Sequence, residues 1–170
     1  MIERYETEEM KRIWSEKNRF QKWLVVELAV CEAWAEEGRI PAEAMETIRK
    51  KAGFDVARIA EIESSTHHDV IAFVSSVAEK IGPEGRFIHL GLTSSDVVDT
   101  AGALLLVEAL DTLVETLKAF SSLVLEKARE YRHVPCVGRT HGIHGEPTTF
   151  GLKILNWYSQ LQRDLERLEL

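Results

Sequence analysis

Apolar residues recur at helical spacing along almost the whole chain, whereas the polar and apolar alternation of a half-buried strand is nearly absent. This pattern predicts an all-α protein. In the first part of the chain we expect four helices, which begin at a Ser15 cap, at Pro41, at an Asp55 cap and after Thr66 or His67. The first ends near Glu37, the second at Gly53 and the fourth near Lys80, and a GPEG turn follows at 82–85. Residues 1–93 are therefore predicted to form a compact N-terminal domain of short helices.

A much longer helix is predicted from Ser94 to about Arg132, where no proline occurs and the only glycine, Gly102, lies near the beginning. Its apolar residues follow heptad steps of three and four, namely Ala103, Leu106, Leu110, Leu113, Leu117, Phe120 and Val124. A helix of roughly 38 residues is about 57 Å long. The remaining sequence cannot cover such a rod. We therefore expect further helices, from other copies of the chain or from sequence absent here, to pack along it.

The segment HVPCVGRTHGIHGEP at 133–147 is predicted to be irregular, with one short strand near Cys136, and a last helix is expected to start near Pro147. That helix is still amphipathic at Leu170 and has no stop signal there. Residues 94–170 are thus predicted to be the start of a truncated long-helix bundle domain. We expect the chain to be an N-terminal piece of a longer protein.

Composition and charge narrow the class of protein. Residues of the AVILMFWYC set make up 45% of the 170 residues, charged residues make up 29%, and the net charge is −7. The acidic balance argues against a nucleic-acid partner, and the longest apolar run, 101–107, is far shorter than the roughly 20 residues that span a bilayer. Cys31 and Cys136 form no CxxC pair, which favours a reducing, cytoplasmic compartment.

Three short loops concentrate the candidate chemistry. In STHHDV at 65–70, His68 lies beside Asp69 at a helix start, an arrangement suited to a general acid or base whose tautomer a carboxylate fixes. In HLGLTSSDVVDT at 89–100, Thr93 and Ser94 begin the long helix. Their hydroxyls are either simple caps or, with the free N–H groups there, donors to a carboxylate or phosphate.

The third loop is GRTHGIHGEPTTFG at 138–151, in which repeated glycines allow the backbone to approach a ligand closely. The HxxH spacing of His141 and His144 raises a metal site, but neither an HExxH pattern nor a Cys/His quartet supports one. A serine nucleophile is disfavoured because GLTSSD lacks the GxSxG elbow and a preceding strand.

Taken together, four segments resemble the fumarase/aspartase superfamily of elimination enzymes. They are RYETEEMKRIWSEKNRFQKWLVVE, THHDVIAF, HLGLTSSDVVDT and GRTHGIHGEPTTFG, in the superfamily's order and spacing, and they cover essentially the whole chain. The RY start and the THHD segment favour the members that act on adenylosuccinate over those that act on argininosuccinate, and over fumarase and aspartase.

The resemblance implies a helical fold in which long central helices of four subunits pack into one bundle, as a homotetramer, with each active site shared between subunits. It implies β-elimination of fumarate from adenylosuccinate, giving AMP, and from the succinyl-carboxamide ribotide intermediate of purine nucleotide synthesis. No metal or organic cofactor is implied. The small-molecule nucleotide would be held by local donors around its carboxylates.

Carried over residue by residue, the resemblance makes His141 the general acid and His68 an accompanying catalytic histidine. The substrate-binding residues it implies are Arg4 and Tyr5 at the phosphate, Thr93 and Ser94 at a succinyl carboxylate, and His67, His68 and Asp69 elsewhere on the substrate. His89 is a further candidate near the phosphate, whereas His144, Ser95 and Asp96 are expected to shape loops and caps.

One signature of the superfamily is missing, a flexible serine-containing loop whose serine is the candidate base. We therefore expect the base in sequence absent here and the isolated piece to be inactive. Two alternatives remain open: a sister lyase that releases fumarate from another succinyl adduct, such as an argininosuccinate lyase-like enzyme, and a non-catalytic helical oligomerisation module whose purpose is the heptad seam.

Overall fold

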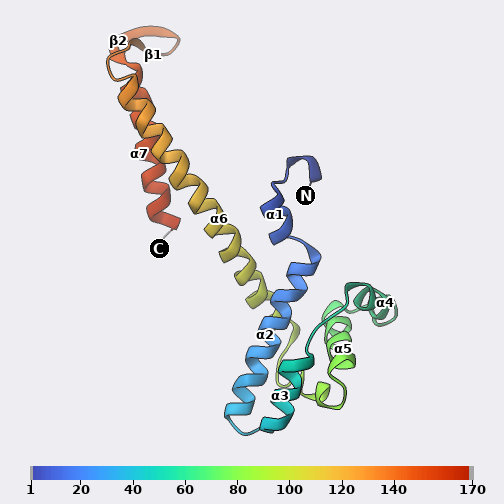
Figure 1. The fold of residues 1–170 in the computed structure, drawn as a ribbon. Helices are drawn as coiled ribbons and strands as arrows, with labels where there is room; N and C mark the ends of the chain where they lie inside the picture. The colour runs from blue at the N-terminus through green and yellow to red at the C-terminus, as the bar shows by residue number, and fades with distance from the viewer. Residues whose placement is uncertain (1, 169–170) are drawn as a thin grey trace. The chain divides into compact units, whose positions relative to one another are not determined.

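The computed structural model describes residues 2–168, which are mostly helical (Figure 1). The chain divides into two compact units, Met1–Glu108 and Ala109–Leu170, and each is described by itself. The all-α class is confirmed, with the addition of one small sheet of two strands. No helix within residues 2–168 is long and apolar enough to cross a bilayer.

Within the described residues, the first unit contains five α-helices of its own, two short 3₁₀ helices and the start of the long helix. They are η1 (Glu3–Tyr5), α1 (Glu8–Ile13), α2 (Glu16–Glu36), α3 (Ala42–Lys51), α4 (Val56–Thr66), α5 (Asp69–Ile81), η2 (Pro83–Phe87) and the beginning of α6 (Ser94–Glu130). Two predicted caps are confirmed. The Ser15 hydroxyl accepts the Asn18 N–H at 3.2 Å, and the Asp55 carboxylate accepts the Ala57 N–H at 2.9 Å.

Two predicted helix starts are wrong by one or two residues. Pro41 is the N-cap of α3 rather than its first helical residue, and α5 begins at Asp69 with His68 as its N-cap. The second error has a local cause, because His67 adopts a left-handed conformation with φ 51° and ends α4. Consequently His67 and His68 serve different backbone roles.

Aromatic rings form the centre of the first unit's core. Phe73 lies against Phe20 at 5.6 Å, Trp23 at 5.4 Å and Phe54 at 6.0 Å between ring centroids, and Phe20, Trp23 and Phe73 are almost fully buried. The buried cluster also takes in Val97 and Ala101 of α6. The domain boundary predicted between residues 93 and 94 stays a prediction, while the compact unit continues along α6 to Glu108.

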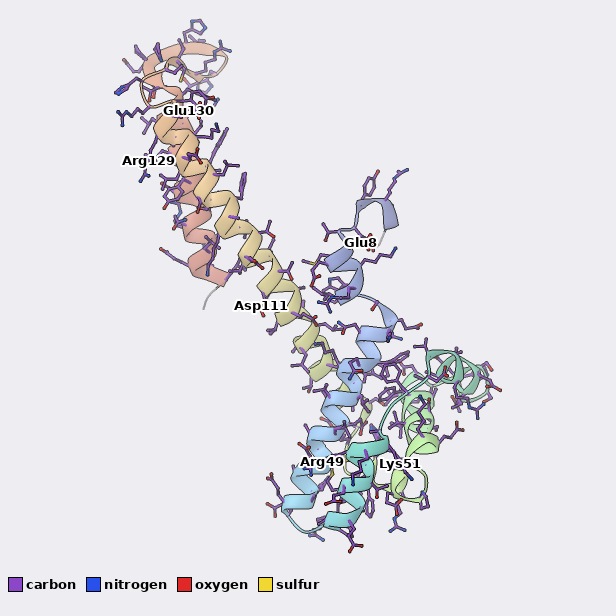
Figure 2. The ribbon with its side chains drawn as sticks, viewed as in Figure 1. Glu8, Arg49, Lys51, Asp111, Arg129 and Glu130 are labelled. Carbon is purple, nitrogen blue, oxygen red and sulfur yellow. The ribbon has the colours of Figure 1, made fainter. Side chains whose placement is uncertain are left out.

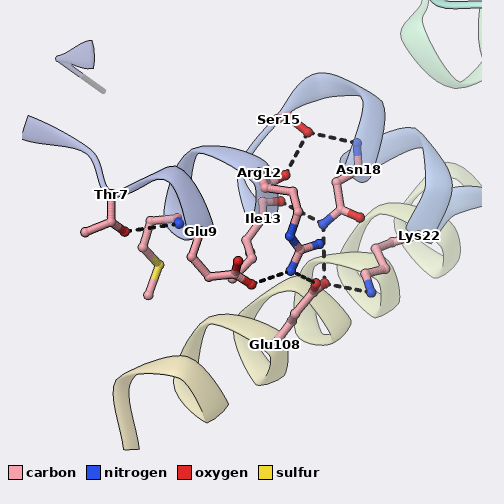
Figure 3. A network of polar contacts seen from close by, with 9 residues as sticks. Thr7, Glu9, Arg12, Ile13, Ser15, Asn18, Lys22 and Glu108 are labelled. Carbon is pink, nitrogen blue, oxygen red and sulfur yellow. Dashed lines mark hydrogen bonds and ion pairs between the residues drawn. The ribbon is translucent and has the colours of Figure 1, made fainter. Parts of the chain in front are cut away.

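Glu108 ties this stretch of α6 to the first two helices (Figure 3). Its carboxylate contacts the Arg12 guanidinium at 2.7 Å and the Lys22 ammonium at 2.8 Å, and it accepts a hydrogen bond from the Asn18 amide at 3.3 Å. These donors lower the pKa of Glu108 to about 2, with Lys22 the largest cause. The carboxylate therefore stays ionised over the ordinary pH range.

The second unit consists of the rest of α6, strands β1 (Pro135–Thr140) and β2 (Ile143–Thr149), and α7 (Phe150–Leu168). Val124 and Ala128 of α6 pack against Ile154 of α7, and the Gln162 amide donates to the Ser121 hydroxyl at 2.8 Å. The short strand predicted near Cys136 is confirmed as β1, but the prediction that the rest of the segment is irregular is wrong. The strands pair as an antiparallel hairpin, Pro147 lies within β2, and the last helix begins at Phe150.

Most of the predicted heptad seam is exposed in this chain. Leu106, Leu113 and Phe120 are 55%, 42% and 51% exposed, whereas Val124 is buried. Charged side chains occupy the surface as well, among them Arg49 and Lys51 of α3 and Arg129 and Glu130 of α6 (Figure 2). Because Leu106, Leu113 and Phe120 are exposed, no segment within residues 2–168 covers the apolar face of α6.

Candidate functional site

Backbone conformation singles out three histidines. Among the described residues, the only non-glycine residues with positive φ are His67 (51°), His89 (65°) and His141 (53°). Each lies in a different one of the three loops predicted to carry chemistry. Non-glycine residues in this region are uncommon and cluster at functional sites. The strain therefore marks the same loops as the sequence motifs, by an independent observation.

At the junction of α4 and α5, the left-handed turn at His67 reverses the chain and lets His68 cap the next helix. The His68 Nδ1 accepts the Ile71 N–H at 3.4 Å, which requires a lone pair on that nitrogen. The Asp69 carboxylate lies 3.6 Å from the same nitrogen, too far for a hydrogen bond, and accepts the Val70 N–H at 2.7 Å instead. The backbone rather than Asp69 thus sets the neutral tautomer, and the Nε2 of His68 carries the hydrogen.

The start of α6 forms the second loop. Thr93 donates its backbone N–H to the Asp96 carboxylate at 2.8 Å, the reciprocal half of a capping box. Within residues 2–168 no hydrogen bond is recorded from the hydroxyls of Thr93 and Ser94, and Thr93 is exposed. Asp96 thus caps the helix as expected, and the hydroxyls stand beside the positive end of its dipole.

His89, just before this helix start, is bound by a residue that the sequence analysis did not single out. The Glu27 carboxylate of α2 accepts the His89 backbone N–H at 2.8 Å and lies 2.6 Å from its Nδ1. Glu27 is fully buried. A signal for it existed in the sequence, because Glu27 occupies a position in the apolar stripe of α2, where an unpaired carboxylate would be very unfavourable.

Arg4 and Tyr5 lie in η1 and are exposed. The Arg4 guanidinium lies 4.8 Å from the centre of the Tyr5 ring, so the two side chains form one cationic and aromatic pair. Neither makes a recorded hydrogen bond to His67, His68, Thr93 or Ser94 within the described residues. The first unit therefore carries its candidate residues as separate groups.

In the second unit, His141 lies at the tip of the β1–β2 hairpin. His141 and Gly142 both have positive φ (53° and 74°), as the two central residues of a type I′ turn require, and Thr140 pairs with Ile143 around them. His141 is exposed, and His144 lies on β2 opposite Arg139. The hairpin thus presents His141 at its most accessible point.

His141 and His144 have an HxxH spacing, which raises the question of a metal site in the hairpin. Within the described part of the chain, no three His, Cys, Asp or Glu side chains gather closely enough to hold an ion. His141 is at the turn and His144 is in a strand, so the spacing does not place them on one helical face as in an HExxH helix.

Comparison with known proteins supports the resemblance. The lyase family matches residues 3–170. The adenylosuccinate lyase of Bacillus subtilis is 52% identical and that of Thermotoga maritima 51% identical, each over 99% of this chain and 39% of the relative. The chain therefore spans about two fifths of the length of these relatives.

Solved structures share the fold. A fumarate lyase from Mesorhizobium superposes with a TM-score of 0.88 at 27% identity, over 94% of this chain and 38% of that one. The 3-carboxy-cis,cis-muconate lactonizing enzyme from Pseudomonas putida superposes with a TM-score of 0.84 at 30% identity, with the same coverage. The expected fumarase/aspartase-type fold is thus confirmed, and by the match over residues 3–170 the chain belongs to the lyase family.

Proposed function

We propose that the protein to which this chain belongs is an adenylosuccinate lyase, which releases fumarate from adenylosuccinate to give AMP and from the succinyl-carboxamide ribotide of purine synthesis. The observation that carries the proposal is the identity of about half of all positions with adenylosuccinate lyases, which extends over 99% of this chain and so includes all three candidate loops. The strained histidines in those loops support it independently.

The reaction is a β-elimination. A base removes a proton from the carbon next to a succinyl carboxylate, which gives a carbanion delocalised into that carboxylate. The carbon–nitrogen bond then breaks with its electron pair going to nitrogen, and an acid protonates the departing nitrogen. Preorganised donors must therefore hold the negative charge on the carboxylate during the reaction.

His141 is the proposed acid. Its position at the tip of an exposed hairpin allows its ring to enter a site completed by other parts of the protein. His68 is the accompanying histidine, and the hydrogen on its Nε2 makes it a donor to the substrate or to the proton-transfer path.

The remaining residues are proposed to bind substrate. The hydroxyls of Thr93 and Ser94 would donate to a succinyl carboxylate at the start of α6, where the helix dipole also favours an anion. Arg4 and Tyr5 would bind the phosphate, for which a guanidinium is well suited. His67 and Asp69 would contact the substrate beside His68.

The base is proposed to come from sequence outside this chain, and the site from three subunits of a cytoplasmic homotetramer. The exposed seam of α6, including Leu113 and Phe120, supports the oligomer because an apolar surface of this kind is stabilised by burial. No metal or organic cofactor enters the proposed reaction.

A second candidate is another fumarate-releasing lyase, which the structural similarity to the Mesorhizobium fumarate lyase favours. Fumarate release by the full-length protein, followed by ultraviolet absorbance with adenylosuccinate and with argininosuccinate, separates the two. Turnover of argininosuccinate alone would exclude the first proposal, and no turnover of either would exclude both.

The role of His141 has a direct test in the full-length enzyme. His141→Gln should lower kcat by about 100-fold or more with little change in KM, because general acid catalysis contributes roughly 10²–10⁴ in rate. His144→Gln, three residues away in the same hairpin, is the matched control and should keep most of the activity. Near-normal turnover in His141→Gln would remove it from the mechanism.

A further inference from the structure

One face of α2 holds the loop that leads into the start of α6. Glu27, Cys31 and Trp34 lie at steps of four and three, so they project from the same side of the helix. Cys31 Sγ lies 3.6 Å from the Phe87 carbonyl, Glu27 binds His89, and the Trp34 indole N–H donates to the Leu90 carbonyl at 2.8 Å. Three consecutive contacts therefore fix the backbone from residue 87 to residue 90.

The hydrogen bonds of the Cys31 and Trp34 side chains to this loop go to its backbone carbonyls only. Burial raises the pKa of the Cys31 thiol to about 11, so the thiol stays protonated and directs its hydrogen to the Phe87 carbonyl. The Trp34 ring also lies against Gly91, where an added Cβ would come within 3.2 Å of the ring and where φ is 77°. Glycine is thus required at this close approach.

Glu27 differs because it binds a side chain as well as the backbone. Its side chain has no exposed surface, and both of its carboxylate oxygens are used by His89, one by the backbone N–H and one by Nδ1. The His89 side chain is 24% exposed, so the ring reaches from a buried carboxylate to the surface. Within residues 2–168 no partner is recorded for its Nε2.

We propose that Glu27 is a positioning residue, which fixes the ring orientation and the Nδ1–H tautomer of His89 and leaves Nε2 directed to the substrate. The inference rests on the proposed function and deepens it. A buried carboxylate that accepts from one ring nitrogen decides which nitrogen is left for a ligand. It also holds the left-handed backbone of His89, which is unfavourable without such support.

The contact also serves the neighbouring site. His89 lies four residues before Thr93, and the intervening backbone is fixed at Leu90 and Gly91 by Trp34. The loop that positions Thr93 and Ser94 is therefore anchored at the Glu27–His89 pair. A one-ångström displacement of donors in such a site is costly to catalysis.

The test uses the full-length enzyme with Glu27→Gln, which keeps the shape of the side chain. The amide offers only one oxygen and puts an NH₂ group against a donor of His89, so the ring or the backbone must move. We expect kcat/KM for adenylosuccinate to fall about 10- to 100-fold, as for residues that orient a functional histidine. Glu27→Asp keeps the charge but is one methylene shorter. Its kcat/KM should lie between the values of the wild type and of Glu27→Gln.

Glu32→Gln is the matched control, since it is the same substitution on the same helix. The Glu32 side chain is 47% exposed and pairs with Arg49 at 3.0 Å, away from His89. Its kcat/KM should stay within about twofold of the wild type, as is usual for surface substitutions. Thermal melting of each variant identifies any loss of folded enzyme.

A double-mutant cycle distinguishes positioning from general destabilisation. In a His89→Ala background, Glu27→Gln should change kcat/KM by no more than about twofold. If Glu27 acts through the His89 ring, its substitution has little further effect once that ring is removed, so the two effects do not add. An undiminished effect in that background, or wild-type kinetics in the single variant, would overturn the inference.

A crystal structure of the Glu27→Gln enzyme supplies a readout that does not depend on activity. We expect the His89 ring to be rotated or displaced, with the backbone of α2 unchanged. An unmoved ring would count against the inference. If the wild-type enzyme releases no fumarate from adenylosuccinate, the proposed function fails, and the ring position still decides whether Glu27 orients His89.

Discussion

The two units of this chain differ in where their apolar side chains lie. The first unit buries a cluster of aromatic and aliphatic residues from α2, α3, α5 and α6, with Phe20, Phe73 and Ile48 almost completely removed from solvent. The second unit has a small cluster centred on Val124, Ala128 and Ile154. On its helices, Phe120, Leu123 and Trp157 are about half exposed.

This contrast shows which parts of the chain supply their own stability. Burial of an apolar side chain contributes roughly 1.5–3 kcal/mol, so the first unit gains most from contacts within the chain. The second unit also carries large apolar side chains, but its own residues leave several of them exposed to solvent. The homotetramer proposed above would bury that surface, and three pairs of substitutions sharpen the comparison.

The largest effect is expected in the aromatic core. Phe73→Ala should lower the free energy of unfolding by about 3–5 kcal/mol, because it removes a buried ring and leaves a cavity. Phe120→Ala, the same substitution at a half-exposed position of α6, should change it by no more than about 0.5 kcal/mol in the dilute chain. Urea unfolding followed by circular dichroism measures both. Equal losses would mean that the two units do not differ as described.

An intermediate effect is expected where the second unit is closely packed. A Cβ at Gly151 would overlap the backbone of Ala128 and Arg132, so Gly151→Ala should cost about 1–3 kcal/mol. Gly102→Ala is the control, because nothing lies within 4 Å of its added Cβ. In a helix interior that change should stabilise by roughly 0.5–1 kcal/mol. Thermal melting should therefore shift in opposite directions for the two variants.

The smallest effect is electrostatic and depends on pH. Glu108→Gln removes the carboxylate that Lys22 and Arg12 bind, and it should cost about 1 kcal/mol at neutral pH, the upper end of the range for ion pairs at a protein surface. The pKa of Glu108 is lowered from 4.5 to about 2 in the folded chain, so its contribution is present above pH 4.5. It is lost as the pH falls toward 2.

Unfolding curves of the wild type and Glu108→Gln should therefore converge in acid. Glu126→Gln, an exposed position further along α6, serves as the control. A difference between wild type and Glu108→Gln that stayed constant from neutral pH to pH 2 would contradict the lowered pKa.

Helices and their caps were predictable because their signals are local. The Ser15 and Asp55 side chains bond to N–H groups two or three residues away, and an uninterrupted apolar pattern identifies α6. The errors at Pro41 and His68 are of one or two residues. The first arises because proline can precede the first helical residue as well as occupy it, and the second because the left-handed His67 ends α4 and moves the next helix start to Asp69.

The β1–β2 hairpin escaped prediction for a different reason. Its strands contain glycine, proline and histidine and are largely exposed on both faces, so no alternation of polar and apolar residues marks them. The HG pair at 141–142 by itself does not predict a type I′ turn, because that turn is indicated only where alternating strands flank the two residues. His141 was identified as a site residue without its structural setting.

By itself, the sequence determined the helical class, the long α6 with its exposed seam, the loops that contain His67, His68, Thr93 and His141, and the family. These follow from short-range periodicity and from motifs that lie in single segments. Only the tertiary structure decided that Glu27 binds His89, 62 positions away, and that Glu108 joins Arg12 across 96 positions. A buried carboxylate is satisfied by whichever donor the fold brings to it, and chain spacing carries no information about that partner.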